Sequence, residues 1–284
     1  MNLWLEITFS VLSGAGGFVL GSLASRLPKP WWLLGYFLPL GLILFYGVGN
    51  HYPSLLAAPG VSWLLLGHKK FMLLGFVAAM VLATPLSRLP QKRDRVVIGL
   101  LIVAAVFGIS VWPFLAPAFN RRELASLHTR INGEGVCLQN TGYTCGPAAA
   151  VTLLRKLGLP AEEGELAVLS QTSSATGTPP DLLAEALRQR YGQEGLVVQY
   201  RFFNNLDELQ QAGPALAVVK FSFMVDHYVA VLKVTDTTVT VGDPLNGLDT
   251  ISRADFLQRW RFCGIVLQRR PEVKTTAASA AGGR

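Results

Sequence analysis

Four apolar stretches in the first 118 residues have about the length needed to cross a bilayer. A transmembrane helix takes about 20 apolar residues, because each residue adds about 1.5 Å along the helix axis. The third stretch is shorter and would need to thin the bilayer or to recruit its flanking residues. We therefore expect an α-helical membrane bundle of about four spans over residues 1–118. The stretches run from Leu3 to Ala24, Trp31 to Gly49, Phe71 to Leu86 and Val96 to Ala118.

A fifth apolar segment, Leu55 to Gly67, is interrupted by Pro59 and Gly60. Both residues disfavour a continuous helix, so we expect an interfacial or re-entrant segment here rather than another span. The first stretch could also be a secretory signal peptide. It lacks a basic N-terminal region and carries Glu6, which favours a retained span.

The charged residues are divided unevenly between the two parts of the chain. Only 15% of all residues are charged, against about 25% in an ordinary globular domain. Residues 1–118 hold eight basic and two acidic side chains, whereas residues 119–284 hold 17 basic and 16 acidic ones. A nucleic-acid partner is not expected, because the soluble-looking part is nearly neutral. The same composition excludes a fully soluble or fully disordered chain, and it makes the lipid bilayer an expected partner.

Basic residues in the short loops give a weak indication of orientation. Two loops on one side, Arg26 to Lys29 and Arg88 to Arg95, hold six Lys or Arg residues. The opposite side holds five, namely Lys69, Lys70, Arg121, Arg122 and Arg130. Because positive residues favour the cytoplasmic side, we expect the C-terminal domain on the non-cytoplasmic side of a multi-pass membrane protein.

Residues 119–270 have the pattern of a compact α+β domain with an antiparallel sheet, because helical segments come first and short β-branched runs follow. Residues 271–284 have low complexity and are expected to be a disordered tail. The expected helices are Gly146 to Leu157, Glu163 to Leu169, Pro180 to Tyr191 and Ala254 to Trp260, segregated to one side of the sheet. The expected strands are Leu196 to Tyr200, Ala215 to Phe221, His227 to Val234, Thr237 to Gly242 and Cys263 to Gln268.

Cys145 stands at the expected start of a helix. Pro147 suits the first helical turn, where a missing backbone N–H costs nothing, and apolar residues continue to Leu157. Unpaired N–H groups and the positive end of the helix dipole stabilise a thiolate at this position and lower the thiol pKa from about 8.5. On this evidence alone, a reactive and a structural cysteine are equal alternatives.

A thiolate nucleophile needs a partner that can hold and return a proton. Of the four histidines, two lie in the membrane part and one lies in a polar connector, which leaves His227. If the turn after its strand centres on Thr235, His227 directly opposes Asp243 and their side chains share one face of the hairpin. A slip of one residue would put them on opposite faces. The alternative is a strand-end histidine beside an ordinary Asp-Pro turn.

Gln139 lies six residues before Cys145, on the loop that approaches it. Acyl transfer requires hydrogen-bond donors aimed at the oxyanion, and the Gln139 amide and the Cys145 backbone N–H could supply two. Glutamine is common in turns, so this signal is weak by itself.

These motifs together resemble the bacteriocin-processing, double-glycine leader peptidases, which are papain-like cysteine peptidases. The resemblance covers roughly Gly135 to Leu267. It implies that Cys145 is the nucleophile, His227 the general base and acid, Asp243 the group that orients the imidazole, and Gln139 a member of the oxyanion hole. The matching motifs are Gln139, Tyr143-Thr-Cys145-Gly-Pro-Ala-Ala, Gly177-Thr178 before a helix, Asp226-His227-Tyr-Val, and Asp243-Pro244 followed by Gly247.

The chain departs from the best-known members of that family in two ways. Those proteins carry the peptidase at the cytoplasmic N-terminus of an ABC exporter, whereas here it follows the apolar spans. The sequence also has no Gly-x-x-x-x-Gly-Lys phosphate loop, so ATPase activity would come from a separate exporter. The resemblance implies a peptide or leader-peptide substrate, cut after Gly-Gly.

Two cysteines, Cys137 and Cys263, are left over. In a domain outside the cytoplasm they suggest a disulfide, with two separate buried thiols as the alternative. No ligand pair has a usual metal spacing, so neither a metal site nor a cofactor is expected. Two other functions stay open: a peptide-binding module of an export system without catalysis, and a cell-wall amidase or transpeptidase on the same fold.

Overall fold

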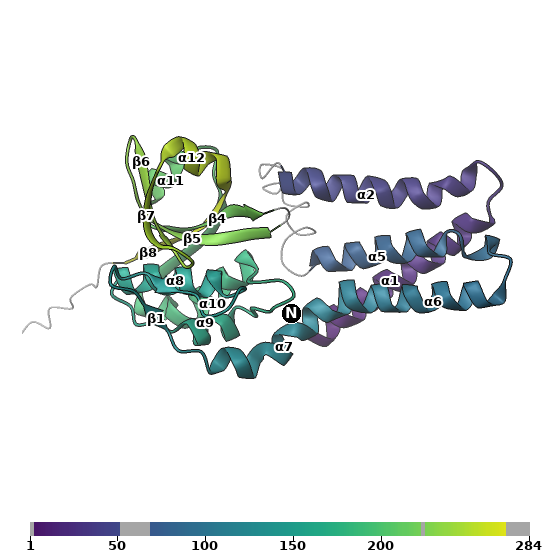
Figure 1. The fold of residues 1–284 in the computed structure, drawn as a ribbon, viewed down its shortest axis with the longest axis horizontal. Helices are drawn as coiled ribbons and strands as arrows, with labels where there is room; N and C mark the ends of the chain where they lie inside the picture. Colours follow the sequence, from purple (N-terminus) through teal and green to yellow (C-terminus); the bar gives the residue numbers. More distant parts are fainter. Residues whose placement is uncertain (1–2, 52–68, 223–224, 271–284) are drawn as a thin grey trace, which may run out of the picture.

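The structure is a computed structural model that describes residues 3–51, 69–222 and 225–270. A bundle of long helices forms one end of the molecule and an α+β part forms the other (Figure 1). The segment from Leu55 to Gly67 and the tail from residue 271 lie outside the described residues, so the expectations for them stay untested.

Within the described residues, four helices are long and apolar enough to cross a membrane, as expected: Trp4–Arg26, Trp31–Val48, Lys70–Arg88 and Lys92–Ala125. Their apolar side chains are largely exposed on the outside of the bundle, as lipid-facing residues would be. The elements are α1 (Leu3–Arg26), η1 (Trp31–Leu33), α2 (Leu34–His51), α5 (Lys69–Ala83), η2 (Leu86–Arg88), α6 (Lys92–Val106), the π-helical turn η3 (Phe107–Val111) and α7 (Trp112–Ala125).

Small residues recur every four positions along α1, at Ser13, Gly17, Gly21 and Ser25, and this stripe lets α1 approach α5 closely. A Cβ atom at Gly17 would lie 2.2 Å from the Phe76 carbonyl oxygen, and Ser13 donates a hydrogen bond to the Met72 carbonyl at 2.9 Å. Small side chains permit such backbone contact, and hydroxyl groups add hydrogen bonds across the interface. The stripe therefore serves packing inside the bundle.

The last apolar helix is longer than a bilayer requires. Segments α6, η3 and α7 form 34 continuous helical residues, which span about 50 Å against a hydrocarbon thickness of about 30 Å. Its far end enters the α+β part, where Leu124 is fully buried. The expected boundary between residues 118 and 119 thus falls inside α7, and the helix belongs to both parts of the chain.

The α+β part is built on a six-stranded antiparallel sheet with the strand order β3-β8-β4-β5-β6-β7. Two short strands, β1 (Arg130–Ile131) and β2 (Cys137–Leu138), pair separately. The sheet strands are β3 (Leu196–Phe202), β4 (Ala215–Ser222), β5 (Val225–Val234), β6 (Thr238–Asp243), β7 (Gly247–Ser252) and β8 (Trp260–Arg269). This architecture confirms the expected α+β class.

Helices cover both faces of the sheet, which corrects the expectation of helices on one side only. The first core joins α8, α9 and α10 to one face. The second core, with Phe256 and Trp260 at its centre, joins α11 and α12 to the other. The bounds are α8 (Cys145–Lys156), α9 (Glu163–Leu169), α10 (Pro180–Tyr191), η4 (Gly192–Glu194), α11 (Leu206–Ala212) and α12 (Arg253–Arg259).

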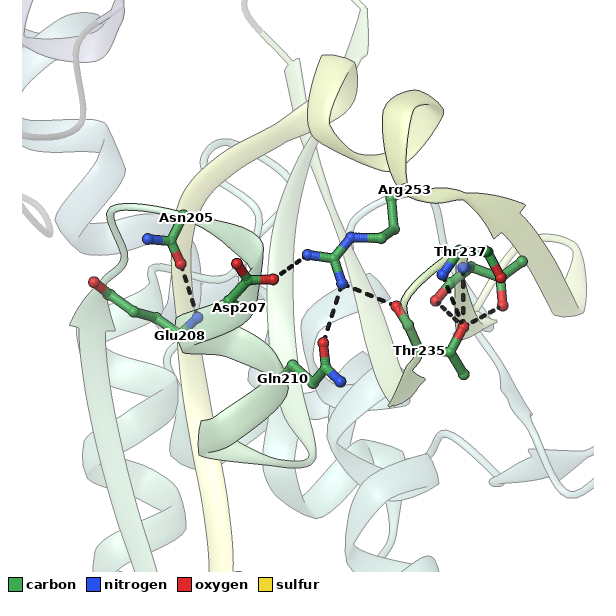
Figure 2. A network of polar contacts seen from close by, with 8 residues as sticks. Asn205, Asp207, Glu208, Gln210, Thr235, Thr237 and Arg253 are labelled. Carbon is green, nitrogen blue, oxygen red and sulfur yellow. Dashed lines mark hydrogen bonds and ion pairs between the residues drawn. The ribbon is translucent and has the colours of Figure 1, made fainter.

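Arg253 of α12 forms polar contacts with α11 and with the β5–β6 turn on this second face (Figure 2). Its guanidinium donates to Gln210 Oε1 at 3.0 Å and to the Thr235 carbonyl oxygen at 2.9 Å, and it forms an ion pair with Asp207. One side chain thus joins α12, α11 and the β5–β6 turn. It lies on the face of the sheet away from α8, so its role is to hold the fold.

Candidate active site

Cys145 is the first residue of α8. The helix begins here because Thr144 and Thr141 close a tight turn just before it: the Thr144 hydroxyl donates to the Thr141 carbonyl at 3.3 Å and accepts from the Thr141 N–H at 3.2 Å. Pro147 lies in the first helical turn, as expected. Cys145 itself is 9% exposed, at the edge of the first core.

His227 and Asp243 meet across the β5–β6 hairpin. His227 Nε2 lies 2.7 Å from Asp243 Oδ1, and His227 is 6% exposed. Cys145 interacts with the same imidazole and raises its pKa. Because Nε2 faces the carboxyl group, Nδ1 is the ring nitrogen left for the sulfur. The structure therefore brings Cys145, His227 and Asp243 together in one row.

The strand register behind this contact differs from the expected one. Val231 pairs with Val241 rather than with Val239. Val234 pairs with Val239, so the turn centres between Asp236 and Thr237 instead of on Thr235, and the register shifts by one residue between Val231 and Lys233. His227 and Asp243 are therefore not directly opposed, and the expected pairing was wrong by two residues. A shift of two residues keeps each side chain on its face of the sheet, so the two still meet diagonally.

Asp243 is held by three donors. Its Oδ1 also accepts from the Leu245 N–H at 2.9 Å, and its Oδ2 accepts from Asn246 Nδ2 at 2.8 Å. Burial alone would raise the pKa of this carboxyl group, but the bonds from His227, Leu245 and Asn246 together lower it below its usual value. Asp243 is therefore a carboxylate with a fixed orientation at neutral pH.

The environment of His227 stabilises its protonated form. Burial would lower the pKa of the imidazole, but the hydrogen bond to Asp243, the hydrogen bond to Cys145 and the charges of both raise it to about 9. At neutral pH the ring is thus ready to donate a proton.

Gln139 lies on the loop before Cys145, joined to the hairpin that carries Asp243. Its backbone N–H donates to the Pro244 carbonyl at 3.0 Å, and its side-chain Nε2 donates to the Thr141 carbonyl at 2.7 Å. Its Oε1 is buried without a hydrogen-bond partner among the described residues. The bond to Thr141 fixes the amide plane and leaves the second Nε2 hydrogen for another acceptor.

Glu163 supports this loop, and its role was not expected from the sequence. The side chain is fully buried, and its Oε1 accepts from the Asn140 backbone N–H at 2.9 Å. Its Oε2 accepts from the Asn140 side-chain amide. An acidic residue in the first turn of a helix is ordinary in sequence, so only its burial identifies it.

The expected disulfide between Cys137 and Cys263 is not formed, and both residues are free, buried thiols. Cys137 lies in the short strand β2 and Cys263 in the sheet strand β8, each packed into the first core. Burial raises the pKa of each thiol to about 12, so both stay protonated at neutral pH. Among the described residues, no group of three or more His, Cys, Asp or Glu side chains could hold a metal ion.

Residues 134–274 match the family model described as the Peptidase C39 family. The C-terminal domain belongs to this family. The match begins just before the loop that carries Gln139 and extends beyond β8, so it includes every residue of the row described above.

Two curated relatives match the C39 domain in sequence. An uncharacterised protein of Methanothermobacter marburgensis is 29% identical over 147 residues, which cover 52% of this chain and 97% of that protein. An uncharacterised protein of Methanothermobacter thermautotrophicus is 28% identical over 147 residues, which again cover 52% of this chain and 97% of that protein.

Solved C39 domains resemble this one in structure. The peptidase domain of Streptococcus ComA, a bi-functional ABC transporter involved in quorum sensing, matches with a TM-score of 0.42 and 19% identity, covering 51% of this chain and all of that one. A double glycine motif protease from an AMS/PCAT transporter, in complex with the leader peptide, matches with a TM-score of 0.40 and 18% identity, with the same coverage.

Proposed function

We propose that the chain is a membrane-anchored cysteine peptidase whose catalytic residues are Cys145, His227, Asp243 and Gln139. The observation that carries the proposal is the buried His227 imidazole, which lies 2.7 Å from Asp243 and whose pKa is raised by both Asp243 and Cys145. A nucleophile, a base and a group that orients the base are the components of this chemistry.

The reaction follows from this row. The Cys145 sulfur attacks the peptide carbonyl carbon, and the carbonyl electron pair moves onto oxygen. His227 then gives its proton to the amine nitrogen as the C–N bond breaks, which leaves a thioester on Cys145. A water molecule gives a proton to His227 and attacks the thioester, and the product leaves as a carboxylic acid while the thiolate is restored.

Gln139 and the N-terminal N–H groups of α8 are suited to hold the oxyanion. The oxygen becomes negative in the tetrahedral intermediate, and fixed donors stabilise that charge. The bond from Gln139 to the Thr141 carbonyl holds the amide in place before substrate arrives.

The proposed substrates are peptides, with leader peptides cut after Gly-Gly as the specific candidate. The support is membership of the C39 family and the likeness to a domain described as a double glycine motif protease. A separate ABC exporter is the proposed partner. We place the C39 domain, with the expected bounds 119–270, on the non-cytoplasmic side of the membrane, a topology that alkaline phosphatase fused to the C-terminus would report by its activity.

Cleavage assays test the proposal. The full chain in detergent should cut a peptide carrying a Gly-Gly leader, and Cys145→Ala should abolish cleavage with no change in the unfolding midpoint. Cleavage of cell-wall peptides instead would indicate an amidase or transpeptidase. Tight peptide binding with no product, in wild type and variant alike, would indicate a binding module and contradict the proposal.

A further inference from the structure

The end of the last apolar helix reaches the loops around Cys145. The expected span ends at Ala118, and Asn120 lies just beyond it on α7. Asn120 Oδ1 accepts from the Ser174 backbone N–H at 3.1 Å and from the Ser174 hydroxyl at 3.2 Å. The loop that carries Ser174 continues to Thr178, whose side chain faces Gly146: a Cβ atom there would lie 3.0 Å from Thr178 Cβ. Asn120 therefore holds a loop that packs beside the nucleophile.

A second contact from α7 reaches the loop on the other side of Cys145. The Tyr143 hydroxyl donates to Glu123 Oε1 at 3.2 Å, and Tyr143 lies two residues before the nucleophile. Burial, together with the charge and hydrogen bond of Glu123, raises the pKa of Tyr143, so the phenol stays a donor at neutral pH. Glu123 thus limits the movement of the segment that ends at Cys145.

A third route passes through α9. Leu124 is fully buried, and Gly164 lies against its backbone so closely that a Cβ atom at Gly164 would be 2.5 Å from the Leu124 carbonyl oxygen. The neighbouring Glu163 holds Asn140 in the loop of Gln139. The position of α7 therefore affects two loops, residues 139–144 before Cys145 and the loop that carries Ser174.

We propose that residues 120–124 of α7 position the catalytic loops, so that Asn120 and Glu123, at the end of a membrane helix, are positioning residues for Cys145. The inference rests on the proposed cysteine chemistry. It gives the apolar helices a function beyond anchoring, because a displacement of the last helix reaches both the loop before Cys145 and the Ser174 loop. Small misplacements of reacting groups cost large factors in rate, about a hundredfold for 1 Å.

The test measures the alkylation of Cys145 by iodoacetamide in the full chain, because this probe needs no identified substrate. Glu123→Ala and Tyr143→Phe should each slow alkylation at pH 7 by roughly five- to tenfold, since a displaced sulfur loses part of its contact with His227. The double variant should be slowed no more than either single one, because both remove the same bond. Glu123→Gln keeps an acceptor oxygen and should restore the wild-type rate to within about twofold.

Two controls separate positioning from general damage. Glu185→Ala removes an exposed acidic residue from α10 that pairs with Arg188, and it should leave the rate unchanged. The unfolding midpoints of all variants should agree, so that a slower rate reports geometry. If wild-type alkylation does not depend on His227, shown with His227→Gln, the proposed function itself fails. If it does depend on His227 but Glu123→Ala reacts like wild type, the positioning role alone is contradicted.

Discussion

At the scale of single residues, the proposed chemistry depends on the His227 imidazole. It is buried, and its interactions with Asp243 and Cys145 outweigh the effect of burial on its pKa. His227 could be predicted from the sequence, because the other three of the four histidines lie in the membrane part or in a polar connector. Its partner Asp243 followed from the two-residue periodicity of strands, which survives a register error of two. Glu163 did not follow from the sequence, since nothing local distinguishes a buried acid from a solvated one.

The raised pKa of His227 predicts the pH dependence of activity. In the proposed mechanism the protonated ring donates to the leaving amine, so peptide cleavage should fall as the pH rises through about 9. The free energy of unfolding should also fall as the pH rises. The stability gained from His227 is complete below the ordinary pKa of about 6.5 and is lost as the pH approaches 9. Asp243→Asn removes the charge and should move the basic limb of the pH–rate profile to lower pH. A limb that stays at the same pH in this variant would show that Asp243 does not act on the imidazole.

Removing the Glu163 side chain should destabilise the domain and impair catalysis. Glu163→Ala leaves two partly buried Asn140 donors without this partner, which costs about 1–3 kcal/mol in the free energy of unfolding. The freed loop should also lower kcat, because it carries Gln139. Denaturant unfolding and cleavage rates measure both effects. The neighbouring, exposed Glu162→Ala is the matched control and should stay within about 0.5 kcal/mol of wild type; equal effects of the two substitutions would count against this role.

At the scale of elements, periodicity predicted the helices and most strands, with α9 and α10 found at the expected residues. It missed α11, although Asn205 caps that helix by accepting from the Glu208 N–H at 2.9 Å, a signal visible in the sequence. Strand β7 was also missed. It is an edge strand with few buried residues, so it lacks the apolar alternation of a half-buried strand. The irregularity in the β5–β6 ladder depends on pairing between strands and has no local signal.

The contact between α7 and α9 should be sensitive to a single methyl group. Gly164→Ala would put its Cβ atom 2.5 Å from the Leu124 carbonyl oxygen, so the helices must separate, at a cost of about 1–3 kcal/mol in stability. Gly192→Ala is the control, because Gly192 has open space around it and a φ of −59° that alanine adopts. Thermal unfolding of both variants measures the difference, and equal midpoints would show that the two helices are not closely packed in solution.

At the scale of the whole molecule, one helix, Lys92–Ala125, connects the apolar helical bundle to the α+β part. The four apolar helices follow directly from composition, because a long uncharged stretch has few other stable structures. The 34-residue length of the last helix was not expected, since its final turns contain polar residues and lie beyond the apolar run. Their contacts with the active-site loops involve residues far apart in the sequence. Such contacts become visible only when the fold is known.

The reactivity of Cys145 tests the central claim most directly. A peptide with a thiol-reactive group at its C-terminus, added to the full chain at neutral pH, should give one adduct per chain, located on Cys145 by mass spectrometry. Cys137 and Cys263 should stay unlabelled, because burial keeps both thiols protonated. His227→Gln should slow labelling by at least about a hundredfold, because the thiolate loses its partner. An adduct that forms at the same rate without His227, or no adduct on Cys145, would contradict the proposal that this domain is a cysteine peptidase.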